Sequence, residues 1–221
     1  MNRFLKRAWA EIDLDALEHN YNEIKKLAKG KDILAVVKAN AYGHDDKAVC
    51  LKLQELGVKY YGVSNLWEGE KLRCHGITGT ILTFGYTDED YFDELLEYGI
   101  TQTAGSVQYA KQLSDYAVSK GVKLPVHIKV NTGMTRVGID SQQEMLDILA
   151  MPGLDCKAAY THFAAADSLD PSDVEYTDRQ QEKLMKIAKD KGLLIHSQNS
   201  GGIIYHGDFG GDIVRAGVIL Y

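Results

Sequence analysis

The sequence of 221 residues is poor in cysteine and proline and has no long apolar run. Its three cysteines are an odd number without Cys-x-x-Cys spacing, which argues against a disulfide framework or a cysteine zinc site and indicates a reducing, cytoplasmic compartment. Three prolines and no Gly/Ser-rich stretch give no internal domain boundary, so residues 1–221 are expected to form one domain. No apolar run approaches the roughly 18 residues that cross a bilayer, so we expect no membrane partner.

The chain also lacks an excess of positive charge. Its formal net charge is −6, and its lysines and arginines are scattered along the sequence, which argues against nucleic-acid binding. Hydrophobic residues make up 45% of the chain and charged residues 25%, which is typical of a folded globular domain with a sizeable core.

Short apolar runs alternate with segments of helical periodicity. The runs are 33–37, 60–64, 80–84, 101–104, 126–130, 158–161, 193–196 and 213–220. They recur at roughly 20 to 35 residues, which is the period of βα units in a parallel sheet. Eight such units in this length predict an α/β fold, a compact (β/α)8 TIM barrel. The alternative is a doubly wound open sheet, but no G-x-G-x-x-G follows the first run.

Active sites of such barrels lie at the carboxyl ends of the strands, and Lys38 ends the first apolar run. Desolvation at the lip of a strand favours a neutral amine, which is nucleophilic toward carbonyl groups. The alternative is a lysine that snorkels from a strand end to solvent.

The fifth run alternates between apolar and polar residues. His127, Lys129 and Asn131 share one face of it. Because both faces of a barrel strand are covered, we expect this polar set to point into the barrel.

The seventh run leads into the small residues of segment 199–202, and the eighth run itself supplies segment 215–218, with Arg215 and Gly217. Small residues let backbone N–H groups approach an anion, and barrels often bind phosphate after strands seven and eight. Two flexible turns are the alternative. We expect no metal, because no H-E-x-x-H occurs and His206, Asp208 and Asp212 read as a polar loop.

Together these motifs resemble the alanine racemase family, the fold type III enzymes that use pyridoxal 5'-phosphate (PLP). The sequence AVVKANAYGH at 35–44 is similar to the family's PLP-lysine motif. The resemblance extends over segments 8–20, 126–138, 161–164, 196–200 and 214–221 in the family order. It implies a barrel that binds PLP and a small amino-acid substrate.

The resemblance also implies a role for each site residue. Lys38 would form a Schiff base with PLP and act as one of two acid/base groups. Arg136 would bond the cofactor's phenolic oxygen, and His162 would lie beside the ring and orient Arg215, which faces the pyridine nitrogen. Asn199 would be a supporting polar group. The residues expected to hold the phosphate are Tyr42, Ser200, Gly217 and Val218.

Lys129 is a further candidate, for modification. It would lie near Arg136, and two buried cations repel each other. Reaction of a neutral Lys129 amine with CO2 would give a carbamate that reverses the charge, and some alanine racemases carry one at the matching lysine. The chain departs from the family pattern at Asp45, where glycine is usual, and at Asn131, where aspartate is usual.

Family members continue into a β-rich C-terminal domain that carries the opposite base. The chain is therefore expected to be the isolated barrel domain of an isomerase, with that domain and the second base absent and with little or no activity of its own. The implied function is conversion of L-alanine to D-alanine for the bacterial cell wall, by a full-length homodimer. Open alternatives are a serine racemase of the same family, a non-catalytic PLP-homeostasis barrel, and a D-threonine-aldolase-like lyase, which would need a metal.

Overall fold

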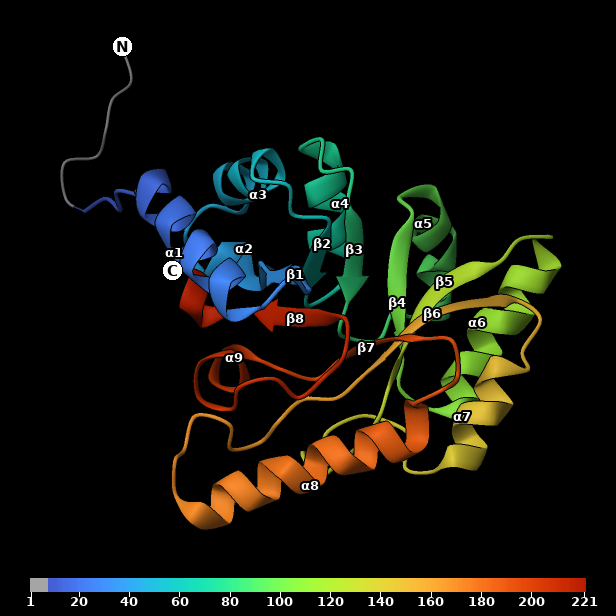
Figure 1. Ribbon diagram of the computed structural model, residues 1–221. Coiled ribbons are helices and arrows are strands. Elements are labelled where there is room, and N and C mark those ends of the chain that lie inside the picture. Colours follow the sequence, from blue (N-terminus) through green and yellow to red (C-terminus); the bar gives the residue numbers. More distant parts are fainter. Residues whose placement is uncertain (1–7) are drawn as a thin grey trace.

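A computed structural model describes residues 8–221. Eight parallel strands form one sheet in the order β7-β6-β5-β4-β3-β2-β1-β8, which curls into the nearly closed TIM barrel that the sequence predicts (Figure 1). The strands are β1 (Asp32–Val36), β2 (Tyr60–Val63), β3 (Thr80–Thr83), β4 (Ile100–Ala104), β5 (Leu124–Lys129), β6 (Leu154–Tyr160), β7 (Leu194–His196) and β8 (Ile213–Ala216).

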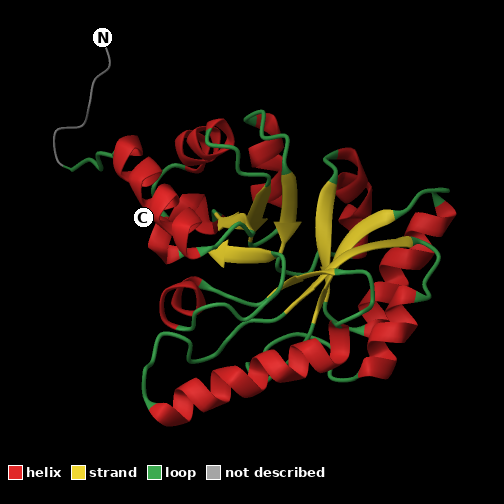
Figure 2. Cartoon of the chain, viewed as in Figure 1, coloured by secondary structure: helices red, strands yellow, loops and turns green. Residues whose placement is uncertain are grey.

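Helices surround the strands on the outside of the barrel (Figure 2). They are α1 (Leu14–Leu27), α2 (Lys38–Tyr42), α3 (Asp46–Glu55), α4 (Leu66–Cys74), α5 (Phe92–Glu97), α6 (Val107–Ser119), α7 (Gln142–Leu149), α8 (Pro171–Ala188) and α9 (Ser200–Tyr205), with short 3-10 helices η1 (Glu89–Tyr91) and η2 (Val218–Leu220). Within residues 8–221, none of these helices is long and apolar enough to cross a membrane.

Side-chain and loop contacts join β7 to β8, where no strand ladder forms. The Asp212 carboxylate accepts from the Ile195 N–H at 2.8 Å, and the Asp212 N–H donates to the Ile195 carbonyl at 2.8 Å. Gly211 makes this approach possible, because a Cβ there would lie 2.8 Å from the Ile195 carbonyl oxygen. These bonds join the middle of β7 to the start of β8, and nearer the carboxyl ends the Arg215 N–H donates to the Gln198 carbonyl at 2.9 Å.

The last strand is shorter than predicted. β8 ends at Ala216, and residues 218–220 form η2 instead of continuing the apolar run 213–220. The chain turns at Gly217, whose N–H donates to Ser200 Oγ at 3.1 Å. The turn takes Gly217 and Val218 out of the strand, and Val218 is exposed.

The inside of the barrel has two chemically different halves. The apolar half, on β1 to β3 and the start of β8, consists of Leu34, Val36, Tyr60, Leu82, Phe84 and Ile213. The polar half, on β5 to β8, consists of His127, Lys129, Tyr160, His196 and Arg215, each no more than 6% exposed. A separate and larger apolar core fills the space between the outer strand faces and the helices.

Candidate active site

A cavity of about 420 Å³ opens at the carboxyl ends of the strands. All ten residues singled out from the sequence line it: Lys38, Tyr42, Lys129, Arg136, His162, Asn199, Ser200, Arg215, Gly217 and Val218. Four of these side chains are basic, and Asp167 is the acidic residue among the lining groups. This excess of positive charge favours an anionic ligand.

Lys38 begins an unusual turn. The four residues Ala39, Asn40, Ala41 and Tyr42 have left-handed backbone, with φ between 53° and 56°, before Gly43 at φ 90°. Left-handed backbone costs about 1–2 kcal/mol for each residue with a side chain. A strain of several kcal/mol is therefore concentrated beside the candidate reactive amine, as occurs at functional sites.

Tyr42, Ser200 and Gly217 form a small polar cradle. The Gly217 N–H donates to Ser200 Oγ at 3.1 Å, and a Cβ at Gly217 would lie 3.3 Å from the Tyr42 hydroxyl and 3.4 Å from Ser200 Oγ. Burial raises the pKa of Tyr42, which keeps its hydroxyl protonated and able to donate. Hydroxyl and N–H donors that converge beside a glycine suit a phosphate.

Arg215 projects from β8 into the polar half and is 3% exposed. Its guanidinium donates to the carbonyl oxygens of Thr161 at 2.6 Å, His196 at 2.7 Å and Ser197 at 3.0 Å. Burial lowers its pKa to about 10, so it remains a cation at neutral pH. Backbone carbonyls rather than a carboxylate hold this buried charge, which leaves its positive field directed into the cavity.

Tyr160 lies close to both Lys129 and Arg215 in the polar half. Its ring centre is 5.4 Å from Lys129 Nζ and 5.5 Å from Arg215 Cζ, and its face stacks on His196. The Thr103 hydroxyl donates to the Thr83 carbonyl, so the Tyr160 hydroxyl donates to Thr103 Oγ1, at 2.8 Å. Burial raises the pKa of Tyr160 to about 12, so the ring lies beside both basic side chains without adding charge of its own.

His162 is a neutral group in this cavity. Burial, followed by the charges of Arg215, Arg136, Lys129 and Lys38, lowers its pKa to about 3. Its Nε2 lies 3.5 Å from Asn199 Nδ2, which makes Nε2 the acceptor of a long hydrogen bond. The hydrogen-bond partners of Arg215 are Thr161, His196 and Ser197, whereas the His162 side chain bonds to Asn199.

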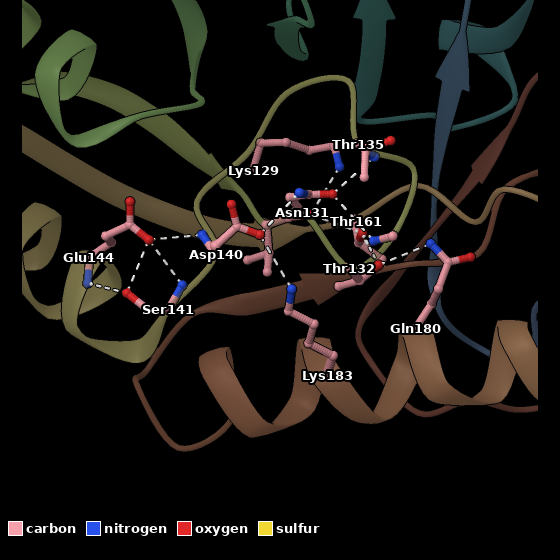
Figure 3. Close-up of polar contacts among 12 residues, drawn as sticks. Lys129, Asn131, Thr132, Thr135, Asp140, Ser141, Glu144, Thr161, Gln180 and Lys183 are labelled. Atoms are coloured by element: carbon pink, nitrogen blue, oxygen red, sulfur yellow. Dashed lines mark hydrogen bonds and ion pairs between the residues drawn. The ribbon is translucent and has the colours of Figure 1, made fainter.

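Arg136 lies on the loop between β5 and α7, and Asn131 organises this loop. Asn131 Oδ1 accepts from the Thr135 N–H at 3.0 Å, and its Nδ2 donates to Asp140 at 3.0 Å (Figure 3). The expectation that Asn131 points into the barrel with His127 and Lys129 is therefore wrong. The strand ends at Lys129, so the period-two alternation that carried the prediction no longer applies at residue 131.

A second set of contacts fastens the same loop to α8. The Gln180 amide donates to Thr132 Oγ1 at 3.1 Å, and the Thr132 hydroxyl donates to Thr161 Oγ1 at 2.7 Å (Figure 3). These hydrogen bonds therefore fasten the loop that carries Arg136 to Thr161, at the end of β6, and to Gln180 on α8.

The sequence reasoning gave no role to Tyr160 or His196. Both lie on short runs next to motif residues, and both point inward, where each bonds or stacks with another polar residue. The sequence signal that identifies such residues is a polar side chain on a strand that is covered on both faces, as in the run 126–130.

The fold and the cavity define a (β/α)8 barrel with a lysine and an anion cradle at the carboxyl ends of its strands. The family model described as alanine racemase, N-terminal domain, matches residues 12–221. The chain belongs to the alanine racemase family.

Individual relatives agree with this assignment. An alanine racemase of Clostridium perfringens is 39% identical, with the match covering 100% of this chain and 59% of that protein. One of Methanococcus maripaludis is 38% identical over 96% of this chain and 59% of that protein. The chain thus spans about three fifths of the length of these relatives.

Solved structures show the same likeness. The alanine racemase of Clostridium difficile 630 superimposes with a TM-score of 0.92 and 37% identity, covering 99% of this chain and 59% of that one. A histidine racemase from Leuconostoc mesenteroides gives a TM-score of 0.86 and 28% identity, covering 95% and 58%.

Proposed function

We propose that this chain is the PLP-binding barrel of an amino-acid racemase, with alanine as the substrate. The observation that carries the proposal is the convergence of the Lys38 amine and the Tyr42, Ser200 and Gly217 donors in one cationic cavity. The family membership and the alanine racemases among the relatives support it.

The residues present fit PLP. The cofactor has a phosphate, a phenolic oxygen, a ring nitrogen and an aldehyde, and the cavity offers a group suited to each. The cradle suits the phosphate, with the Val218 backbone beside it, Arg136 suits the phenolic oxygen, and Lys38 is the amine that can bond the aldehyde covalently. When bound, PLP supplies the electron-withdrawing ring that makes the proton on the substrate's Cα acidic.

The chain's own residues then determine how that acidity is used. The Lys38 amine removes or returns a proton at the substrate Cα from one face of the ring. Arg215 remains a cation at neutral pH and only donates hydrogen bonds, so beside the ring nitrogen it would leave that nitrogen unprotonated and would moderate the withdrawal of electrons. This arrangement favours prompt return of the proton, which racemisation requires. Neutral His162 and Asn199 add polar contacts without adding charge.

Two experiments on the 221-residue chain test this proposal. PLP followed by borohydride should label the Lys38 peptide, Lys38→Ala should remove the label, and Lys120→Ala at an exposed site should retain it. Labelling mainly at another lysine would contradict the role of Lys38.

The second experiment follows the incorporation of solvent deuterium at Cα of alanine, which should be absent in Lys38→Ala. It separates a racemase barrel from a carrier of PLP, because a carrier would be labelled but would exchange nothing. Serine compared with alanine in the same exchange assay distinguishes the two substrates.

We also propose that Lys129 carries a carbamate. Burial, then the charges of Arg215 and Arg136, lowers the pKa of Lys129 to about 7, so near pH 8 the amine is mostly neutral. Its Nζ donates to the Val130 carbonyl at 3.0 Å. Attack of the neutral amine on CO2 forms an N–C bond and releases one proton, which leaves an anion beside the two arginines. Carbon-13 NMR with labelled bicarbonate should show a carbamate resonance that Lys129→Met lacks; equal spectra would refute it.

A further inference from the structure

The left-handed turn that carries Lys38 is attached to a neighbouring helix. Residues 39–42 adopt positive φ without glycine, so the turn persists only if surrounding contacts hold it. One of the elements that contact the turn is α4, which follows the neighbouring strand β2.

Glu68 on α4 joins two chain segments through its two carboxylate oxygens. Its Oε1 accepts from the Ala39 N–H at 2.8 Å, and its Oε2 accepts from the Ser64 N–H at 2.7 Å. Ala39 is the first left-handed residue after Lys38, and Ser64 immediately follows β2. One carboxylate therefore fixes the start of the strained turn relative to the end of the adjacent strand, with two short charge-assisted hydrogen bonds.

The position of Glu68 is itself determined by the start of its helix. Asn65 caps α4, and its Oδ1 accepts from the Glu68 N–H at 3.1 Å. One helical turn later, Lys71 Nζ lies 2.9 Å from Asp46 Oδ2 and 3.4 Å from Asn40 Oδ1, and Asn40 Oδ1 also accepts from the Asp46 N–H at 3.1 Å. The helix thus contacts the turn at two successive residues, Ala39 and Asn40.

We propose that Glu68 is a positioning residue for Lys38: its carboxylate holds the left-handed turn that aims the lysine amine into the cavity and sets Tyr42 at the cradle. The inference rests on the proposed function for the role of Lys38, but the contacts themselves do not depend on it. Glu68 is not among the residues that line the cavity, so it acts through the backbone and not on the ligand.

Amide hydrogen exchange tests the attachment in the chain without cofactor. In Glu68→Ala the Ala39 and Ser64 amides should exchange about ten- to a hundredfold faster, since each loses a hydrogen bond to a charged acceptor. In Glu68→Gln only one of the two N–H groups can keep an amide oxygen as acceptor, so one amide should stay protected. Amides of β5 serve as the internal reference that the barrel is folded. Unchanged exchange at Ala39 and Ser64 would overturn the proposal.

Labelling by PLP and borohydride then tests the consequence for Lys38. The rate of labelling at Lys38 should fall at least about tenfold in Glu68→Ala, partly recover in Glu68→Gln, and be unchanged at other lysines. Glu70→Gln is the matched control, because it removes a carboxylate from the same helix that pairs with Tyr98 and not with the turn. If wild-type Lys38 is not labelled, the proposed function fails while the exchange result still decides the role of Glu68. Normal labelling of Lys38 in Glu68→Ala would refute the positioning role.

Discussion

The two halves of the barrel interior are stabilised in different ways. The apolar half is filled by side chains such as Leu34, Leu82 and Phe84, which need only fit together. The polar half buries Arg215, Lys129, His127 and other groups that must each find a partner of the right kind. Stability in the first half comes from shape, and in the second from a connected set of hydrogen bonds.

The candidate reactive residues are divided between these halves in a corresponding way. On the apolar side, Lys38 is positioned by a strained backbone turn attached to α4 through Glu68. On the polar side, Arg215 is positioned by direct hydrogen bonds to three carbonyls. Substitutions in the two halves should therefore differ in the size of their effect and in the kind of contact that causes it.

The largest effect is expected from Arg215→Ala. It leaves the carbonyls of Thr161, His196 and Ser197 without the guanidinium that they bond in a buried site. An unsatisfied buried acceptor costs about 1–3 kcal/mol, so the free energy of unfolding should fall by about 3 kcal/mol or more. Urea unfolding measures this loss. Arg179→Ala, at an exposed ion pair with Glu175, should change it by less than about 0.5 kcal/mol. A loss below about 1 kcal/mol in Arg215→Ala would contradict this prediction and show that the three carbonyls find other hydrogen-bond donors.

Acid should destabilise the polar half selectively, with a somewhat smaller effect. Burial lowers the pKa of His127 to about 4, against about 6.5 in an unfolded chain. Between these values the unfolded state binds more protons, so the free energy of unfolding rises with pH and is lost as pH falls from 6.5 to 4. The loss from His127 reaches at most about 3 kcal/mol, with a slope up to about 1.4 kcal/mol per pH unit.

Denaturant unfolding at a series of pH values measures this dependence. In His127→Asn the slope between pH 4 and 6.5 should be shallower, while His19→Asn, at an exposed position on α1, controls for the substitution itself. The buried His196, bonded to His127 at 3.1 Å and also lowered in pKa, should retain part of the slope. An identical slope in His127→Asn and wild type would contradict the attribution of this pH dependence to His127.

In both halves the sequence was more informative about which residues gather at the strand ends than about the backbone that positions them. The barrel could be predicted because eight apolar runs recur at the βα period, and the ten cavity residues because they fall at strand ends within family motifs. The left-handed turn could not, because Ala39 and Ala41 have no local preference for positive φ, and the contact with Glu68 that stabilises it spans 29 residues. Asn131 was misplaced for a related reason, since a strand end depends on tertiary contacts that periodicity does not contain.

The smallest expected effect is that of Gly62→Ala in the apolar half, and its size depends on Phe84. A Cβ at Gly62 would lie 2.6 Å from Phe84 Cζ and 2.8 Å from Leu34 Cδ2, so a neighbour must move. Phe84 also lines the cavity, so its ring has space to shift there. We expect a loss of about 1–2 kcal/mol in the free energy of unfolding, at the low end for overpacking, together with slower labelling of Lys38 by PLP. The double variant Gly62→Ala/Phe84→Leu should recover both quantities if the clash is the cause. Additive losses in the double variant would instead place the strain at Leu34 or in the backbone of β2, and Phe84 would then not be the residue that limits the packing.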